Sequence, residues 1–142
     1  MSRLGTELFR VVIDVPKGLL LKSNGSQGVV HANAARARDL RRLGYIKGRN
    51  LRMPNTVSEP IDMLTVIRYP RRTAKADAPN LYPTVKHLED GLVQAGVLAD
   101  DSYQYVKQHI FMVGEPTGRP RTWQVVITGH RIEEDEEEGS HA

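Results

Sequence analysis

The chain has 142 residues, of which 39% are hydrophobic and 26% charged, a composition that suits one packed domain and excludes a wholly disordered chain. It has no cysteine, which excludes disulfide bonds, cysteine-ligated metal sites and a thiol nucleophile. The net charge is only +3, but without residues 131–142 the chain holds 19 Lys and Arg against 11 Asp and Glu. We therefore expect a basic domain at 1–130 with a polyanionic partner, followed by a disordered acidic tail at 131–142.

The first half of the chain predicts a strand and a helix. Residues 7–14 are rich in β-branched and aromatic side chains, which favours a strand. The Gly- and Ser-containing segment 18–30 has the composition of a loop. Apolar spacing then predicts a helix over 34–47, with Asn33 as its N-cap and Gly48 as its end.

This first helix is strongly basic. Seven Lys and Arg and a single acid lie between residues 35 and 52, without the mixed charges of an ordinary solvated helix. We interpret this face as a polyanion-binding surface, and a basic face that is merely exposed to solvent is the alternative.

The second half predicts one strand, then a helix, then two more strands. A strand covers about 61–69 and continues into a basic connection. A second helix covers about 83–95 and ends at Gly96, and the turn Asp100-Asp101-Ser102 leads to a strand at 103–113. A final strand covers 123–128, and we expect it to pair antiparallel with the preceding one. The predicted fold is a single small α+β domain in the order β-α-β-α-β-β, with about four strands in a mixed sheet and two main helices.

The acids of the basic domain gather in one stretch, because five of its 11 acids lie between residues 77 and 101. From residue types alone, Asp100-Asp101-Ser102 is either a plain turn or part of a carboxylate site for Mg²⁺ or Mn²⁺. A helix of about 13 residues is roughly 20 Å long, so the segments flanking it meet only if one of them folds back. The five histidines lack the spacing of metal ligands, and we expect them at the surface or in strands.

Residues 86–102 carry a more specific pattern. They read Lys-His-Leu-Glu-Asp-Gly-Leu-Val-Gln-Ala-Gly-Val-Leu-Ala-Asp-Asp-Ser. A Lys, an Asp four residues later, a short helical stretch and an Asp-Asp pair resemble the signature of the RusA family of Holliday junction resolvases. The N-terminal strand, the Arg-rich helix and the two final strands resemble that family more weakly.

The resemblance implies a small homodimeric, Mg²⁺-dependent endonuclease that cuts four-way junctions and related branched DNA in recombination and repair, with Mn²⁺ able to replace Mg²⁺. Such proteins are common in phages and prophages. Carried over by position, the catalytic residues are Asp77, Lys86 and Asp101. The candidate metal ligands are Asp77, Asp101, Asn80, Asp100 and Asp90.

One departure from the family pattern supports a second hypothesis. Asp77-Ala78-Pro79-Asn80 resembles the family's Asp-x-Asp-Asn cluster, except that Pro79 stands where a second carboxylate is expected. Asn80 could still supply a carbonyl oxygen to a metal. The alternative function is therefore a catalytically silent protein of the same fold that binds branched DNA.

The expected mechanism is hydrolysis by metal-activated water, with Lys86 stabilising transition-state charge or orienting the water. A two-fold symmetric dimer would make paired nicks in opposing strands. Tyr82 is either a stacking platform for an unpaired base or a packing residue. Phosphate contacts are expected from arginines of the first helix and of the strand exit, namely Arg36, Arg38, Arg41, Arg42, Arg71 and Arg72.

The same sequence argues against a membrane protein. No apolar run approaches the roughly 20 residues that span a bilayer. The first residues lack the apolar core of a signal peptide. We expect the protein in the cytoplasm, or in the host cytoplasm if a phage encodes it, with no membrane partner.

Overall fold

The computed structural model describes residues 4–23 and 30–133. Most of the predicted acidic tail, residues 134–142, lies outside the described residues, and β4 continues one residue past the expected domain end at 130. The elements are β1 (Glu7–Pro16), the short 3₁₀ helix η1 (Lys17–Leu19), α1 (Val30–Asn50), β2 (Ile61–Arg68), the 3₁₀ helix η2 (Ala78–Leu81), α2 (Tyr82–Gln94), β3 (Val106–Val113) and β4 (Thr122–Arg131).

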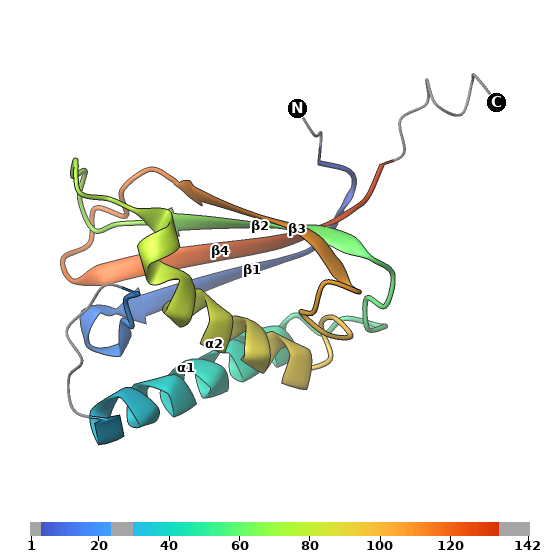
Figure 1. Cartoon of the computed structure of the whole chain (residues 1–142), viewed down its shortest axis with the longest axis horizontal. Coiled ribbons are helices and arrows are strands. Elements are labelled where there is room, and N and C mark those ends of the chain that lie inside the picture. Colours follow the sequence, from blue (N-terminus) through green and yellow to red (C-terminus); the bar gives the residue numbers. More distant parts are fainter. Residues whose placement is uncertain (1–3, 24–29, 134–142) are drawn as a thin grey trace.

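The molecule has two layers, with both long helices covering one face of a four-stranded mixed sheet (Figure 1). The predicted α+β fold with four strands and two main helices is therefore confirmed. No helix in residues 4–23 or 30–133 is long and apolar enough to cross a membrane.

The strand order is β1-β4-β2-β3, and it corrects one expectation. β4 runs antiparallel to β1 and β2, while β3 pairs with β2 in parallel, so the predicted pairing of the last two strands is wrong. Val125 and Ile127 of β4 are almost fully buried, whereas Met112 and Val113 of β3 are about half exposed. The more deeply buried β4 thus takes a central position, and β3 lies at the edge, where exposed side chains are tolerated.

A register shift also changes which side chains of β3 face the helices. Val106 pairs with Ile61, but Gln108 pairs with the next β2 residue, so β3 holds one extra residue. The extra residue places Val106, His109 and Phe111 on the helix-covered face, whereas strict alternation along a strand would put Val106 on the face opposite His109.

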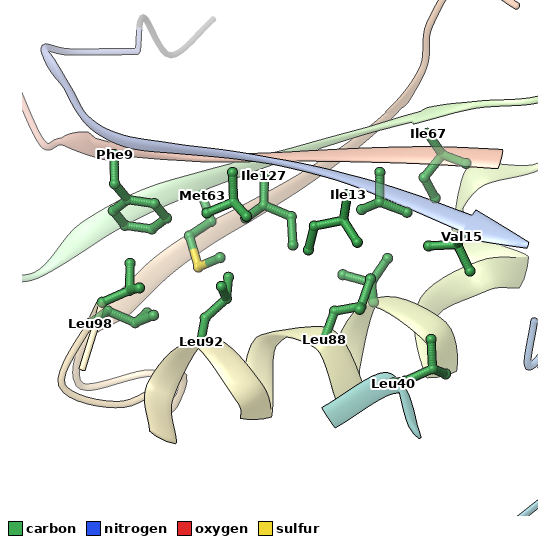
Figure 2. Close-up of a cluster of buried hydrophobic side chains, with 14 of the residues drawn as sticks. Phe9, Ile13, Val15, Leu40, Met63, Ile67, Leu88, Leu92, Leu98 and Ile127 are labelled. Carbon is green, nitrogen blue, oxygen red and sulfur yellow. The ribbon is translucent and has the colours of Figure 1, made fainter. Parts of the chain in front are cut away.

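The core lies between the sheet and α2 (Figure 2). Alternate residues of β1 such as Ile13 and Val15 point toward the helices and are fully buried. Leu88 and Leu92 of α2 meet them from the other layer. Burying each of these side chains contributes about 1.5–3 kcal/mol, so α2 is held firmly over the sheet.

Helix α1 extends past both of its predicted ends, and its glycines serve packing against α2. It begins at Val30 and ends at Asn50, so the expected N-cap Asn33 and the expected end Gly48 both lie inside the helix. A Cβ at Gly44 would stand 2.2 Å from the carbonyl oxygen of Leu88, and a Cβ at Gly91 would stand 2.2 Å from the carbonyl oxygen of Arg41. Glycine is therefore required here for close approach of α1 and α2.

Candidate functional site

The candidate site is built on one side of α2. The predicted helix over 83–95 agrees with the observed Tyr82–Gln94, and Gly96, with a φ of +82°, follows its C-cap as expected. Leu88 and Leu92 turn to the core. Their burial fixes the rotation of the helix, and Lys86 and Asp90, one turn apart, are left half-buried at its side.

Lys86 joins two carboxylates. Its Nζ lies 3.0 Å from Asp90 Oδ1 and also donates a hydrogen bond to Asp101 Oδ2. Asp101 belongs to the turn after α2, so that segment does fold back along the helix. Val97 and Leu98, which precede the turn, are buried in the core and hold it there. The structure therefore brings together Lys86, Asp90 and Asp101 as an acid–lysine–acid cluster.

Lys86 is a fixed positive charge. Partial burial alone would lower its pKa, but the hydrogen bonds to Asp101 and Asp90 outweigh burial and hold the pKa of Lys86 above its ordinary value. Lys86 is therefore protonated at any physiological pH. It can stabilise negative charge or orient a polar group, and it cannot act as a proton-accepting base.

The other acid of the pair, Asp100, serves the turn. Its Oδ1 accepts a hydrogen bond from the backbone N–H of Asp101 at 2.9 Å. This bond is the first cause of a pKa lowered below the ordinary value of Asp100. Asp100 therefore stabilises the turn, and Asp101 faces Lys86.

Asp77 and Asn80 lie elsewhere, around η2 and before the start of α2. The backbone N–H of Asp77 donates to the Tyr69 hydroxyl at 3.0 Å, and its side chain is exposed. The backbone of Asn80 donates to the carbonyl of Asp77 and accepts from the N–H of Ser23. Within residues 4–23 and 30–133, no three or more His, Asp or Glu side chains form a group that could hold a metal ion. The ion-pair partners of Lys86 are Asp90 and Asp101, and Asp77 makes its recorded contacts through its backbone.

The donor chemistry of that cluster still suits a hard cation. Mg²⁺ commonly binds one or two carboxylates and completes its coordination with water and substrate phosphate. Asp90 and Asp101 supply two such carboxylates within reach of one ammonium group. The cluster therefore fits a metal site that the substrate completes. The described residues do not form a cage made only of protein ligands.

Arg41 connects the basic helix α1 to this side of α2. Its Nη1 lies 3.2 Å from His87 Nδ1, and His87 Nδ1 lies 3.9 Å from Asp90 Oδ2. Arginine can only donate, so Nδ1 accepts and the His87 proton resides on Nε2. Burial, and next the charge of Arg41, lower the pKa of His87 below its usual range, which agrees with a neutral ring.

The remaining predicted DNA-binding arginines do not form a single face. Arg38 and Arg42 are exposed on α1, whereas Arg36 is half-buried and donates to Asn33 at 3.3 Å. Arg71 and Arg72 lie in the connection after β2, where Arg72 pairs with Glu115 at 3.3 Å. That connection and the first turns of both long helices lie at the same end of the molecule (Figure 1).

A buried acid on α2 was not singled out by the sequence analysis. Glu89 is 2% exposed, and its Oε2 lies 2.9 Å from His109 Nε2 on β3. The contact lacks hydrogen-bond geometry, so Oε2 has no hydrogen-bond partner within the described part of the chain, and His109 Nε2 pairs with Thr65 Oγ1 at 3.1 Å. Burial raises the pKa of Glu89, and the His109 imidazole opposes that effect. The sequence did indicate that Glu89 is buried, because it occupies a position of the apolar stripe of the helix, between Leu88 and Leu92.

No family model matches the chain, and no curated protein matches it significantly.

Proposed function

We propose that this protein is a Mg²⁺-dependent endonuclease that cuts branched DNA, with the Holliday junction as its substrate class. The observation that carries the proposal is the acid–lysine–acid cluster of Asp90, Lys86 and Asp101, set beside an arginine-rich helix. Cleavage of a phosphodiester needs positive charge to hold the phosphates and carboxylates to hold a metal, and both are adjacent here.

Each residue of the cluster has a distinct role in this proposal. Asp90 and Asp101 hold the ion, which when bound supplies Lewis-acid charge and lowers the pKa of a water. Lys86, permanently charged, stabilises the negative charge that develops on the scissile phosphate. Arg41 contributes charge from α1 and holds His87 in place at the side of the cluster.

The arginines account for binding. Exposed Arg38 and Arg42 on α1, with Arg71 and Arg72 after β2, would contact phosphates without reading base sequence. A dimer with two-fold symmetry would place two clusters on opposing strands of a junction and produce paired nicks. The resemblance of residues 86–102 to the RusA signature supports the same substrate class.

A second function, binding of branched DNA without cleavage, is favoured by a specific observation. Pro79 stands where a second carboxylate is expected, so the segment Asp77-Ala78-Pro79-Asn80 lacks one acid of the family pattern. A protein of this kind would keep the basic surface and the fold, and would lack turnover.

One experiment separates the two functions. The full chain is incubated with an end-labelled synthetic four-way junction, with and without Mg²⁺, and a linear duplex of matched sequence serves as the control. The nuclease proposal predicts Mg²⁺-dependent nicks near the branch point of the junction and none in the duplex. A junction that is bound to saturation and stays intact with Mg²⁺ and with Mn²⁺ would establish the silent binder.

A further inference from the structure

A shallow aromatic cavity, open to solvent, lies between the start of α2 and the edge strand β3. It has a volume of about 500 Å³ and is lined by Pro79, Tyr82, His109 and Phe111. Tyr82 is 46% exposed, although it begins a helix whose next turns are anchored in the core. A large exposed aromatic side chain at the mouth of a cavity is a feature of ligand-binding surfaces.

The rings form a continuous wall. The centroids of Tyr82 and Phe111 are 5.8 Å apart with an interplanar angle of 35°, and those of His109 and Phe111 are 4.5 Å apart. Thr65 and Glu89 approach His109 from behind, at 3.1 Å and 2.9 Å from its Nε2. Because the wall is fixed by the sheet and by buried partners, it is formed before any ligand arrives.

The position of the cavity relates it to the acid–lysine–acid cluster. Tyr82 precedes Lys86 by four residues, so the two side chains lie one turn apart on the same side of α2. On the other flank, the connection after β2 that carries Arg71 and Arg72 leads into Pro79 through Asp77. The cavity therefore lies between the acid–lysine–acid cluster, in which two carboxylates surround one lysine, and a connection that carries two arginines.

This arrangement indicates which class of ligand would bind in the cavity. A polynucleotide alternates phosphates, which the arginines of the connection and a metal ion held by the cluster would bind, with flat bases, which aromatic rings bind by stacking. An apolar peptide side chain would fill the cavity without using the charges on either side. A base can reach the cavity only when it is out of the duplex stack, as at a branch point or in a single strand.

We propose that Pro79, Tyr82, His109 and Phe111 form a binding site for an unstacked nucleobase. The inference rests on the proposed function for its natural substrate, a branched DNA, and gives that substrate a specific contact. It also gives a role to Pro79, because a ring at this position extends the apolar wall where a carboxylate would repel the nucleotide.

The site is tested by photocrosslinking and by affinity, using the full chain. A four-way junction and a single-stranded oligonucleotide each carry one 5-iodouracil, placed beside the branch point in the junction. Irradiation of the complexes is expected to crosslink Tyr82 or Phe111, identified by mass spectrometry of the digested protein. Tyr82→Leu should weaken binding of both probes about tenfold and leave binding of linear duplex within twofold.

Two further variants control the result. Tyr82→Phe keeps the ring and should bind like the wild type, and Tyr103→Leu removes a tyrosine that is 76% exposed and lies outside the cavity. The base site would be overturned by crosslinks confined to other residues. It would also be overturned if Tyr82→Leu bound every probe with the affinity of the wild type. If the wild type binds the single strand through Tyr82 but does not prefer the junction over duplex, the base site stands and the proposed branched-DNA substrate fails.

Discussion

The two sides of helix α2 differ in what their residues can tolerate. The side toward α1 is closed, since Gly91 lies against the α1 backbone with no room for a methyl group. The side toward β3 carries Tyr82 and Lys86, which are partly exposed and face a cavity and a carboxylate pair. Both sides depend on the same rotation of the helix.

The comparison shows how a small domain can hold a charged cluster in place. Lys86 and Asp90 are on the surface, where an ion pair of this exposure contributes only about 0–1 kcal/mol to stability. Their geometry comes instead from the packed side of α2, through Leu88, Leu92 and Gly91. Changes on the packed side should therefore act on folding, and changes on the open side should act on chemistry.

On the open side, Lys86→Met is expected to have a large effect on chemistry. Loss of the fixed charge should slow junction cleavage about 100-fold at saturating DNA, and the melting temperature should change by only a few degrees because the ion pair is partly exposed. Single-turnover cleavage and thermal unfolding measure the two effects. Lys107→Met, which removes an exposed lysine lying over Tyr103, is the matched control and should cleave normally.

On the packed side, Gly91→Ala should destabilise the fold by about 2 kcal/mol. The new methyl group collides with the α1 backbone, at a cost of about 3 kcal/mol, and the better helix propensity of alanine returns about 1 kcal/mol. Denaturant unfolding measures the change in the free energy of unfolding. Gly18→Ala has no neighbouring atom within 4 Å and should stay within about 0.5 kcal/mol of the wild type. Equal stabilities of the two variants would contradict the close packing of the helices.

Glu89→Gln should make the free energy of unfolding depend less on pH in the acid range. Because burial raises the pKa of Glu89, the folded state holds its proton more tightly than the unfolded chain does. The wild type should therefore lose stability as the pH rises from the unfolded pKa, near 4.5, toward the higher folded value. Glutamine cannot ionise, so the variant should lose less stability over that range. Parallel stability curves for both proteins would show that Glu89 is not the titrating group.

Local patterns in the sequence predicted the elements, and contacts between distant residues account for what they missed. Strand 7–14 and helix 83–95 were placed within two residues, since alternation and apolar spacing are local properties. Gly48 resembles a helix end in sequence, and only the presence of α2 makes it a packing residue. Insertion of β4 between β1 and β2 likewise depends on which strand buries more apolar surface, which no short window shows.

For the candidate site as well, the sequence predicted what depends on local spacing and missed what depends on distant contacts. The spacing of Lys86 and Asp90 places them one helical turn apart, and this was visible in the sequence. The approach of Asp101 depends on how the turn folds back, and the family resemblance predicted it without a geometric reason. Arg41 was expected to contact DNA phosphates, but its contact with His87 was not predicted, because the two residues lie on different helices and meet only through glycine packing.

The most direct test of the cleavage site is Asp101→Asn assayed beside the wild type on one labelled four-way junction with Mg²⁺. Asparagine keeps the shape of the side chain and removes the charge that pairs with Lys86 and would bind the ion. We predict that junction affinity stays within about threefold while cleavage falls by at least about 100-fold. Normal cleavage by Asp101→Asn would contradict the assignment of the site to the acid–lysine–acid cluster.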